Sequence, residues 1–211
     1  MVDADFLTAA LVTLLVTVDP PGLAPLFLSV TQGMDREQRR RVAVRASLIA
    51  FAILVFFGFA GEILLGALGI SLPAFRIAGG LLLFTIAFEM IFERREKRKR
   101  ETAETAITLD HVRNVAAFPL AIPLMAGPGA ITAMILLAGR AAGEPVMQGA
   151  LVGVVAIVVG LSFLTFLVAE RVSRLLGVTG NVVLTRLLGV ILAALAVQFV
   201  VDGIRQAFGV G

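Results

Sequence analysis

Two short proline and glycine sequences interrupt apolar segments of this chain, and their residue types are suited to binding a charged ligand. The first is "DPPG", Asp19 to Gly22, and the second is "GPG", Gly127 to Gly129. Proline removes a backbone donor and clashes with the preceding helical turn, so a helix containing these sequences must break. Backbone groups freed inside a membrane must face a cavity or other protein. The two breaks therefore predict a site.

The breaks combine groups that bind an anion with groups that bind a cation. Asp19 is a preferred N-cap and Pro20 fits the first helical position, so one half-helix should end near Thr17 and another should begin after Asp19. Pro128 can start a half-helix in the same way. Two such helix starts, with free N–H groups and partial positive charge, suit a carboxylate. Opened carbonyls and the Asp19 carboxylate suit a cation, so the pattern predicts a site for a zwitterion.

The candidate site residues fall into two groups. The substrate-binding group consists of Asp19, Pro20, Pro21, Gly22, Pro123, Gly127, Pro128, Gly129 and Thr132. The second group, which could line the cavity or couple an ion, consists of Thr17, Ser29, Glu89 and Gln198.

Structural roles stay open for the polar residues of both groups. Asp19 could serve only as a helix cap, although an ionisable group in mid-membrane is by default functional. The hydroxyl groups could bond to the carbonyl four residues earlier. Glu89 could pair with Arg94 at the membrane edge, and Gln198 could bond to a neighbouring helix.

The composition excludes a soluble globular protein. Of the 211 residues, 59% are apolar and only 16% are charged, which is too few to cover a soluble surface. Long uncharged runs, counted at roughly 20 residues for each span, predict an all-helical polytopic membrane protein with six transmembrane helices. We place these crossings near residues 6–31, 44–67, 74–93, 114–138, 147–169 and 186–207.

The two halves of the chain resemble each other. "GEILLGALGISLPAFRIAGG" (61–80) matches "AERVSRLLGVTGNVVLTRLLG" (169–189), with Gly69 placed 108 residues before Gly177. The same offset aligns the two breaks. Because each half holds three crossings, the second half must be inverted relative to the first, as in many secondary transporters. The predicted organisation is a first three-helix repeat at 1–93, a charged linker at 94–113 and a second, inverted three-helix repeat at 114–211.

Positive charge gathers in alternate loops. Of 18 Lys and Arg residues, five lie at 36–45, seven at 94–113 and three at 171–186. The positive-inside rule places these loops in the cytoplasm and both termini outside, in a protein of the cytoplasmic (inner) membrane. We expect the linker to be solvated, with some helix, and its basic run to mark topology rather than to bind nucleic acid. Its His111, the only histidine, has no companion metal ligand nearby.

Motifs for catalysis are lacking. The chain contains no H-E-x-x-H, G-x-S-x-G or phosphate-binding G-x-x-x-x-G-K-[ST], so we expect no enzyme and no cofactor beyond a coupling ion, Na⁺ or H⁺. It has no cysteine and hence no disulfide. The expected partners are a small zwitterionic substrate and the lipid bilayer, without nucleic acid. Assembly into a homo-oligomer stays open, as do the coupling ion and the direction of transport.

Four segments carry a resemblance to a known family. "DPPGLAPLFLSVT", "GISLPAFRIAGGLLLFTIAFEM", "FPLAIPLMAGPGAITAMILL" and "RLLGVILAALAVQFVVDGI" resemble the MarC family of multi-pass membrane proteins, and the likeness covers nearly the whole chain. The family is grouped with amino-acid exporters of the LysE type, and one branch is described as transporting small neutral amino acids. The resemblance implies site roles for Asp19, Pro20, Pro21, Gly22, Pro123, Gly127, Pro128 and Gly129.

These observations together predict a secondary transporter driven by an ion gradient. Its substrate would be a small neutral amino acid such as glycine, alanine or serine, bound at the midplane between the first and fourth helices. Two alternatives remain. One is a passive channel for small solutes or ions, and the other is a membrane scaffold that transports nothing.

Overall fold

The computed structural model describes residues 4–109 and 115–209, and helices make up most of this part of the chain. The expectation for His111 lies outside the described residues. The elements in chain order are α1 (Ala4–Val18), α2 (Pro20–Val30), α3 (Arg36–Ala67), α4 (Leu72–Ile91), α5 (Arg94–Leu109), η1 (Ala116–Met125), α6 (Pro128–Arg140), α7 (Pro145–Leu167) and α8 (Ala169–Phe208).

Within the described residues, five helical stretches are long and apolar enough to cross a membrane. A sixth span results if η1 and α6, which meet at an angle of 59°, cross together. Each stretch overlaps one of the six crossings expected from the sequence, so the all-helical polytopic fold is confirmed. The five stretches are Ala4–Val30, Arg36–Ala67, Leu72–Ile91, Pro145–Leu167 and Thr179–Phe208.

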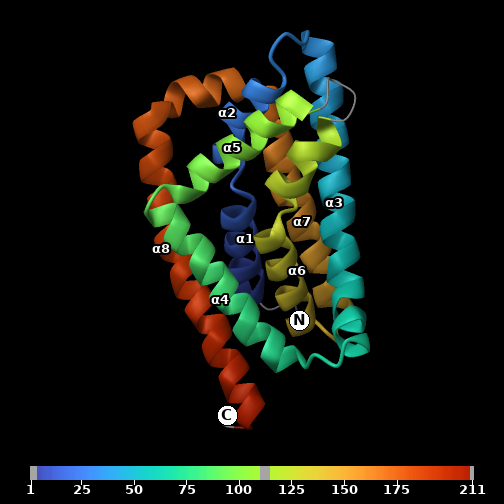
Figure 1. Cartoon of the computed structure of the whole chain (residues 1–211). Helices are drawn as coiled ribbons and strands as arrows, with labels where there is room; N and C mark the ends of the chain where they lie inside the picture. Colours follow the sequence, from blue (N-terminus) through green and yellow to red (C-terminus); the bar gives the residue numbers. More distant parts are fainter. Residues whose placement is uncertain (1–3, 110–114, 210–211) are drawn as a thin grey trace.

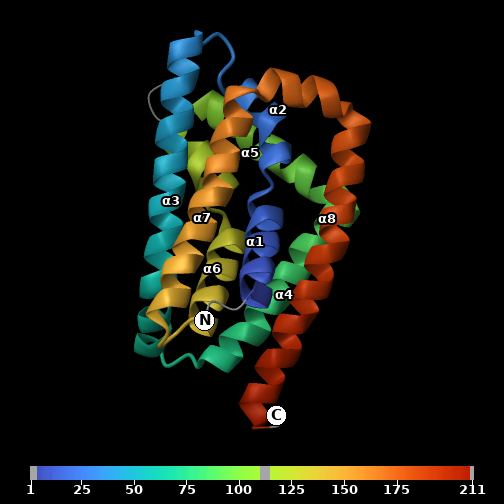
Figure 2. The same cartoon turned by 180° about the vertical axis from the view of Figure 1, so that it is seen from behind.

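The basic segments gather at one end of the bundle. Helix α1 begins and helix α8 ends at the opposite end (Figure 1). The turn between α2 and α3, much of α5 and the start of α8 lie together at the basic end, and Figure 2 shows the same order from behind. Gly69 and Gly177, which the repeat aligns, both adopt left-handed backbone, with φ of 69° and 57°. The inverted repeat and the side of the membrane on which each end lies stay predictions.

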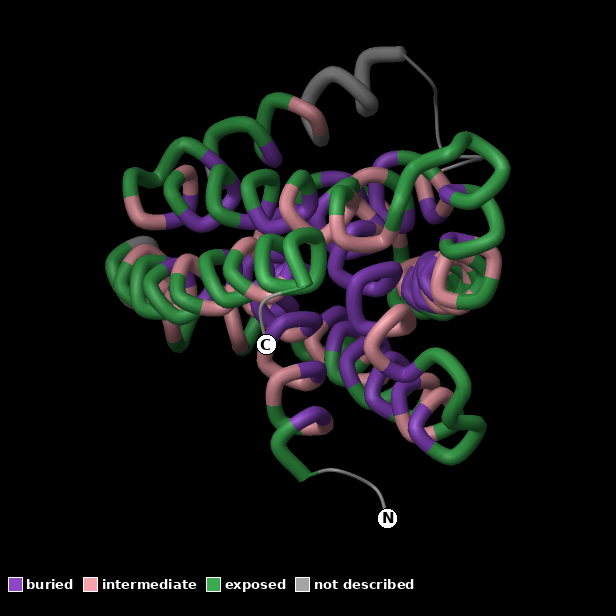
Figure 3. The backbone as a smooth tube through the Cα atoms, turned by 90° about the horizontal axis from the view of Figure 1, so that it is seen from below, coloured by how far each residue is buried: buried purple, intermediate pink, exposed green. Residues whose placement is uncertain are grey.

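Buried residues occupy the centre of the bundle and exposed residues its outside (Figure 3). Many of the exposed residues are large and apolar. Phe56 and Ile63 of α3 are 62% and 75% exposed, which a membrane protein tolerates because lipid covers them. Helices α4 and α8 approach closely at Gly80, where an added Cβ would lie 2.8 Å from the carbonyl oxygen of Ala196. Glycine at 80 is therefore required by the close contact of these two helices.

Candidate functional site

The first helix breaks at Asp19, as the prolines predict. Helix α1 ends at Val18 and α2 begins at Pro20. Asp19 lies between them with φ 58°, a left-handed conformation that aspartate tolerates better than most residues. Its Oδ1 accepts a hydrogen bond from the Gly22 N–H at 3.2 Å, so Asp19 caps α2.

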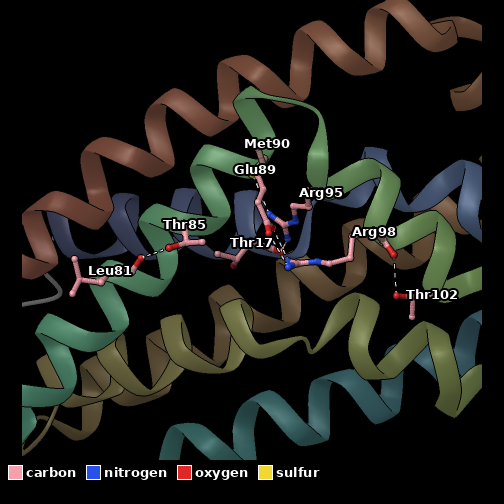
Figure 4. A network of polar contacts seen from close by, with 8 residues as sticks. All are labelled: Thr17, Leu81, Thr85, Glu89, Met90, Arg95, Arg98 and Thr102. Carbon is pink, nitrogen blue, oxygen red and sulfur yellow. Dashed lines mark hydrogen bonds and ion pairs between the residues drawn. The ribbon is translucent and has the colours of Figure 1, made fainter.

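The break also frees carbonyl groups at the end of α1. In a continuous helix the carbonyls of Val16 and Thr17 would accept from the N–H groups four residues later, but those positions are Pro20 and Pro21. Arg95 of α5 replaces one of the missing donors, since its guanidinium donates to the Thr17 carbonyl (Figure 4). The Thr17 carbonyl at the buried end of α1 is therefore bonded by a residue 78 positions away in the chain.

The second break is irregular over a longer stretch. In η1 the backbone is extended at Phe118 and Ile122, the residues before Pro119 and Pro123. Helix α6 then begins at Pro128 with Gly127 as its N-cap, and a glycine has no side chain to accept from the first turn. The N-terminus of α6 thus lacks the capping carboxylate that α2 possesses.

A cavity of about 320 Å³ lies where both breaks meet α5. We call it the break cavity. It joins residues from α1, α4, α5, η1 and α6, so it draws on both broken helices. Its lining consists of Thr17, Leu82, Ile86, Arg95, Arg98, Lys99, Thr102, Pro123, Leu124, Gly127, Pro128, Gly129 and Ala130.

Helix α5 lines the break cavity with Arg95, Arg98, Lys99 and Thr102. Their spacing of i, i+3, i+4 and i+7 puts them on one helix face. Lys99 Nζ lies 3.0 Å from Asp19 Oδ2, and the two side chains are only 10% and 2% exposed. The expectation of a solvated linker is therefore wrong for this face of α5, because the helix places its cations against the broken helices.

Glu89 joins the same network through Arg98. The Arg98 guanidinium lies 2.6 Å from a Glu89 carboxylate oxygen, so the expected pairing with Arg94 at the membrane edge is wrong (Figure 4). The three cations that line the break cavity, one lysine and two arginines, thus face two carboxylates, those of Asp19 and Glu89. One unit of positive charge remains among these five side chains.

The structure gathers part of the predicted substrate-binding group. Thr17, from the second group, also lines the break cavity, together with Pro123, Gly127, Pro128 and Gly129. Pro20 and Gly22 are buried at the start of α2. Pro21 instead lines a neighbouring cavity of about 350 Å³ between α2, α5 and α8.

Asp19 and Glu89 pair with cations that line the break cavity but do not line it themselves, and three further candidates lie away from it. Thr132 packs its methyl group against Gly79 of α4, where an added Cβ would lie 2.8 Å from Thr132 Cγ2. Ser29 is exposed near the end of α2. Gln198 donates to Asp202 at 2.7 Å, beside the ion pair between Asp202 and Arg140.

The sequence does contain a signal for the residues of α5 that prediction missed. Asp19 requires a counter-charge if it is buried, because an unpaired carboxylate is very costly in an apolar interior. The basic run 94–100 is near in sequence to the third crossing, and its spacing already provides a cationic stripe. Combining the two facts would have indicated Lys99 or Arg95 as the residue that pairs with Asp19.

The fold and the break cavity define a multi-pass integral membrane protein whose polar site lies between broken helices. Residues 4–208 match the MarC family of integral membrane proteins, and the chain belongs to that family.

Similar proteins occur in archaea and bacteria. A UPF0056 membrane protein of Archaeoglobus fulgidus is 39% identical over 95% of this chain and 93% of its own length. One from Methanocaldococcus jannaschii is 37% identical over 97% and 98%. The UPF0056 membrane protein YhcE of Escherichia coli is 36% identical over 90% and 88%. These names describe membrane proteins and state no enzymatic activity, and no solved structure matches the chain significantly.

Proposed function

We propose that this protein is a secondary transporter that binds a small neutral amino acid in the break cavity. The observation that carries the proposal is that residues of both broken helices line one cavity, with Thr17 from the first and 127–130 from the second. Its volume of about 320 Å³ is small for a ligand pocket, for which roughly 300–1,000 Å³ is usual. The size favours a substrate with a small side chain.

The substrate carboxylate is expected to bind at the start of α6. Gly127, Pro128, Gly129 and Ala130 line the cavity there, and no side chain caps the helix. A helix N-terminus without a capping carboxylate attracts an anion through its N–H groups and its dipole. The start of α2 is less suitable, because Asp19 already caps it.

The substrate ammonium group requires acceptors, and α5 competes for them. Asp19 is paired with Lys99, Glu89 with Arg98, and the Thr17 carbonyl with Arg95. An ammonium group has the same charge and donor character as these side chains, so it can replace them at the same acceptors. In this proposal α5 closes the empty site, and substrate binding displaces part of its cationic stripe.

The test is uptake of labelled glycine, alanine and serine into proteoliposomes, under a Na⁺ gradient in one series and a pH gradient in the other. We expect saturable uptake with counterflow for the wild-type protein. Asp19→Asn keeps a residue that can cap α2 but removes the charge, so uptake should fall at least about tenfold, the loss expected for one charged hydrogen bond. Far-UV circular dichroism and gel filtration check that the variant folds.

Other results would contradict the proposal in distinct ways. Unchanged uptake in Asp19→Asn would remove this carboxylate from the mechanism. Flux that neither saturates nor shows counterflow would indicate a passive channel. If the amino acids neither cross the membrane nor raise the unfolding temperature of the protein, a scaffold role is favoured.

A further inference from the structure

A second cavity, of about 480 Å³, lies at the basic end of the bundle. It is formed where the turn from α2 to α3 meets the turn from α7 to α8, and Figure 1 shows both turns at that end. We call it the arginine cavity. The charged side chains lining it are those of Arg36, Arg39, Arg40, Glu170, Arg171 and Arg174. Five arginines thus face one carboxylate.

Helix stability does not explain these arginines. Arg36, Arg39 and Arg40 all lie within the first five residues of α3, which begins at Arg36. Cations near a helix N-terminus are opposed by the helix dipole, and an anion is favoured there. Their positions are therefore unfavourable for the helix alone and favourable for binding an anion.

Two arginines of the arginine cavity are fixed by contacts within the protein. Arg39 pairs with Glu170 at 3.0 Å, which links α3 to α8, and the Arg174 Nε donates to the Glu170 carbonyl at 3.3 Å. The Arg39 Nε is buried and has no hydrogen-bond partner within the described part of the chain. A buried guanidinium donor without an acceptor is costly, and an anionic oxygen would satisfy it.

Part of the lining of the arginine cavity is apolar. Phe27 and Phe166 are buried and stacked, with ring centroids 4.6 Å apart. Leu167 and Val168, at the end of α7, are 47% and 41% exposed. The lining therefore combines guanidinium groups from α3 and α8 with apolar surface at the end of a membrane-spanning helix. A free phosphate would use only the guanidinium groups.

We propose that the arginine cavity binds one anionic phospholipid, with its phosphate among the arginines and its acyl chains along Leu167 and Val168. Phosphate diesters match the bidentate geometry of guanidinium groups. The proposal is independent of amino-acid transport, because it involves no residue of the break cavity. Transport can fail while lipid binding holds, and the reverse is also possible.

Native mass spectrometry and lipid titration in detergent test the proposal. Phosphatidylglycerol should bind at least about tenfold more tightly than phosphatidylcholine with the same acyl chains. Arg36→Gln combined with Arg40→Gln should weaken phosphatidylglycerol binding by roughly 30-fold, the effect of two cations near an anionic lipid surface. Arg174→Gln, on α8 rather than α3, should weaken it by roughly fivefold.

The matched control removes the same charge from the same helix. Arg41 and Arg45 are exposed on α3 and do not line the arginine cavity, so Arg41→Gln with Arg45→Gln should leave binding nearly unchanged. An equal loss in this control would mean diffuse electrostatic attraction and would overturn the proposal. Inorganic phosphate or glycerol phosphate that competes at the concentration of the lipid would indicate a free-phosphate site instead. Equal binding of phosphatidylcholine would exclude recognition of anionic lipid.

Discussion

Lys99→Met is expected to lower the free energy of unfolding by about 3–5 kcal/mol, because it leaves the Asp19 carboxylate buried without its charged partner. Asp19 is 2% exposed in its side chain, and Lys99 Nζ lies 3.0 Å from it. Little water can reach the carboxylate to replace the lysine. Unfolding should be followed by far-UV circular dichroism, since the chain has no Trp, Tyr or Cys for intrinsic fluorescence or thiol labelling.

Two controls separate the ion pair from other effects of the substitution. Lys97→Met makes the same change at an exposed position of α5 and should alter stability by no more than about 0.5 kcal/mol. Asp19→Asn combined with Lys99→Met removes both charges and should cost less than Lys99→Met alone, because no buried charge is left unpaired. If Lys99→Met is as stable as the wild-type protein, α5 is not held against the first break by this pair.

The helix breaks could be predicted from the sequence because their causes are local. Proline at 20 and 21 prevents continuation of α1, and aspartate before them is a preferred cap. Helix α1 accordingly ends at Val18, and Asp19 caps α2. The crossings were predictable for a similar reason, since span length depends on the thickness of the bilayer.

The α5 side chains that lie at the site could not be predicted in the same way, because their positions depend on tertiary packing. The run 94–100 is highly charged, and charge density alone indicates solvent. Only the fold shows that α5 turns back across the first break and buries Lys99 and Arg95 there. Thr132 is a different case, since its proximity in sequence to the second break suggested a ligand contact, whereas in the fold its methyl group packs against Gly79 of α4.

Gly127→Ala is expected to destabilise the protein by about 1–3 kcal/mol, the usual cost of forcing extra atoms into a packed site. An added Cβ would lie 2.4 Å from the carbonyl oxygen of Pro123. That oxygen belongs to the backbone, so no change of side-chain rotamer can relieve the clash. Both Pro123 and Gly127 line the break cavity, and the substitution should therefore change its shape as well as the stability of the fold.

Gly153→Ala is the matched control for the effect of Gly127→Ala on stability. Gly153 lies inside α7, and an added Cβ there would meet nothing within 4 Å. Alanine is the better helix former, so the same chemical change should be neutral or stabilising by up to about 1 kcal/mol. If Gly127→Ala lowers the free energy of unfolding and Gly153→Ala does not, glycine at 127 is required by the close approach of two backbone segments. Equal stability of Gly127→Ala and the wild-type protein would mean that the second break is more open than the structure has it, and the break cavity would then be larger than a small amino acid requires.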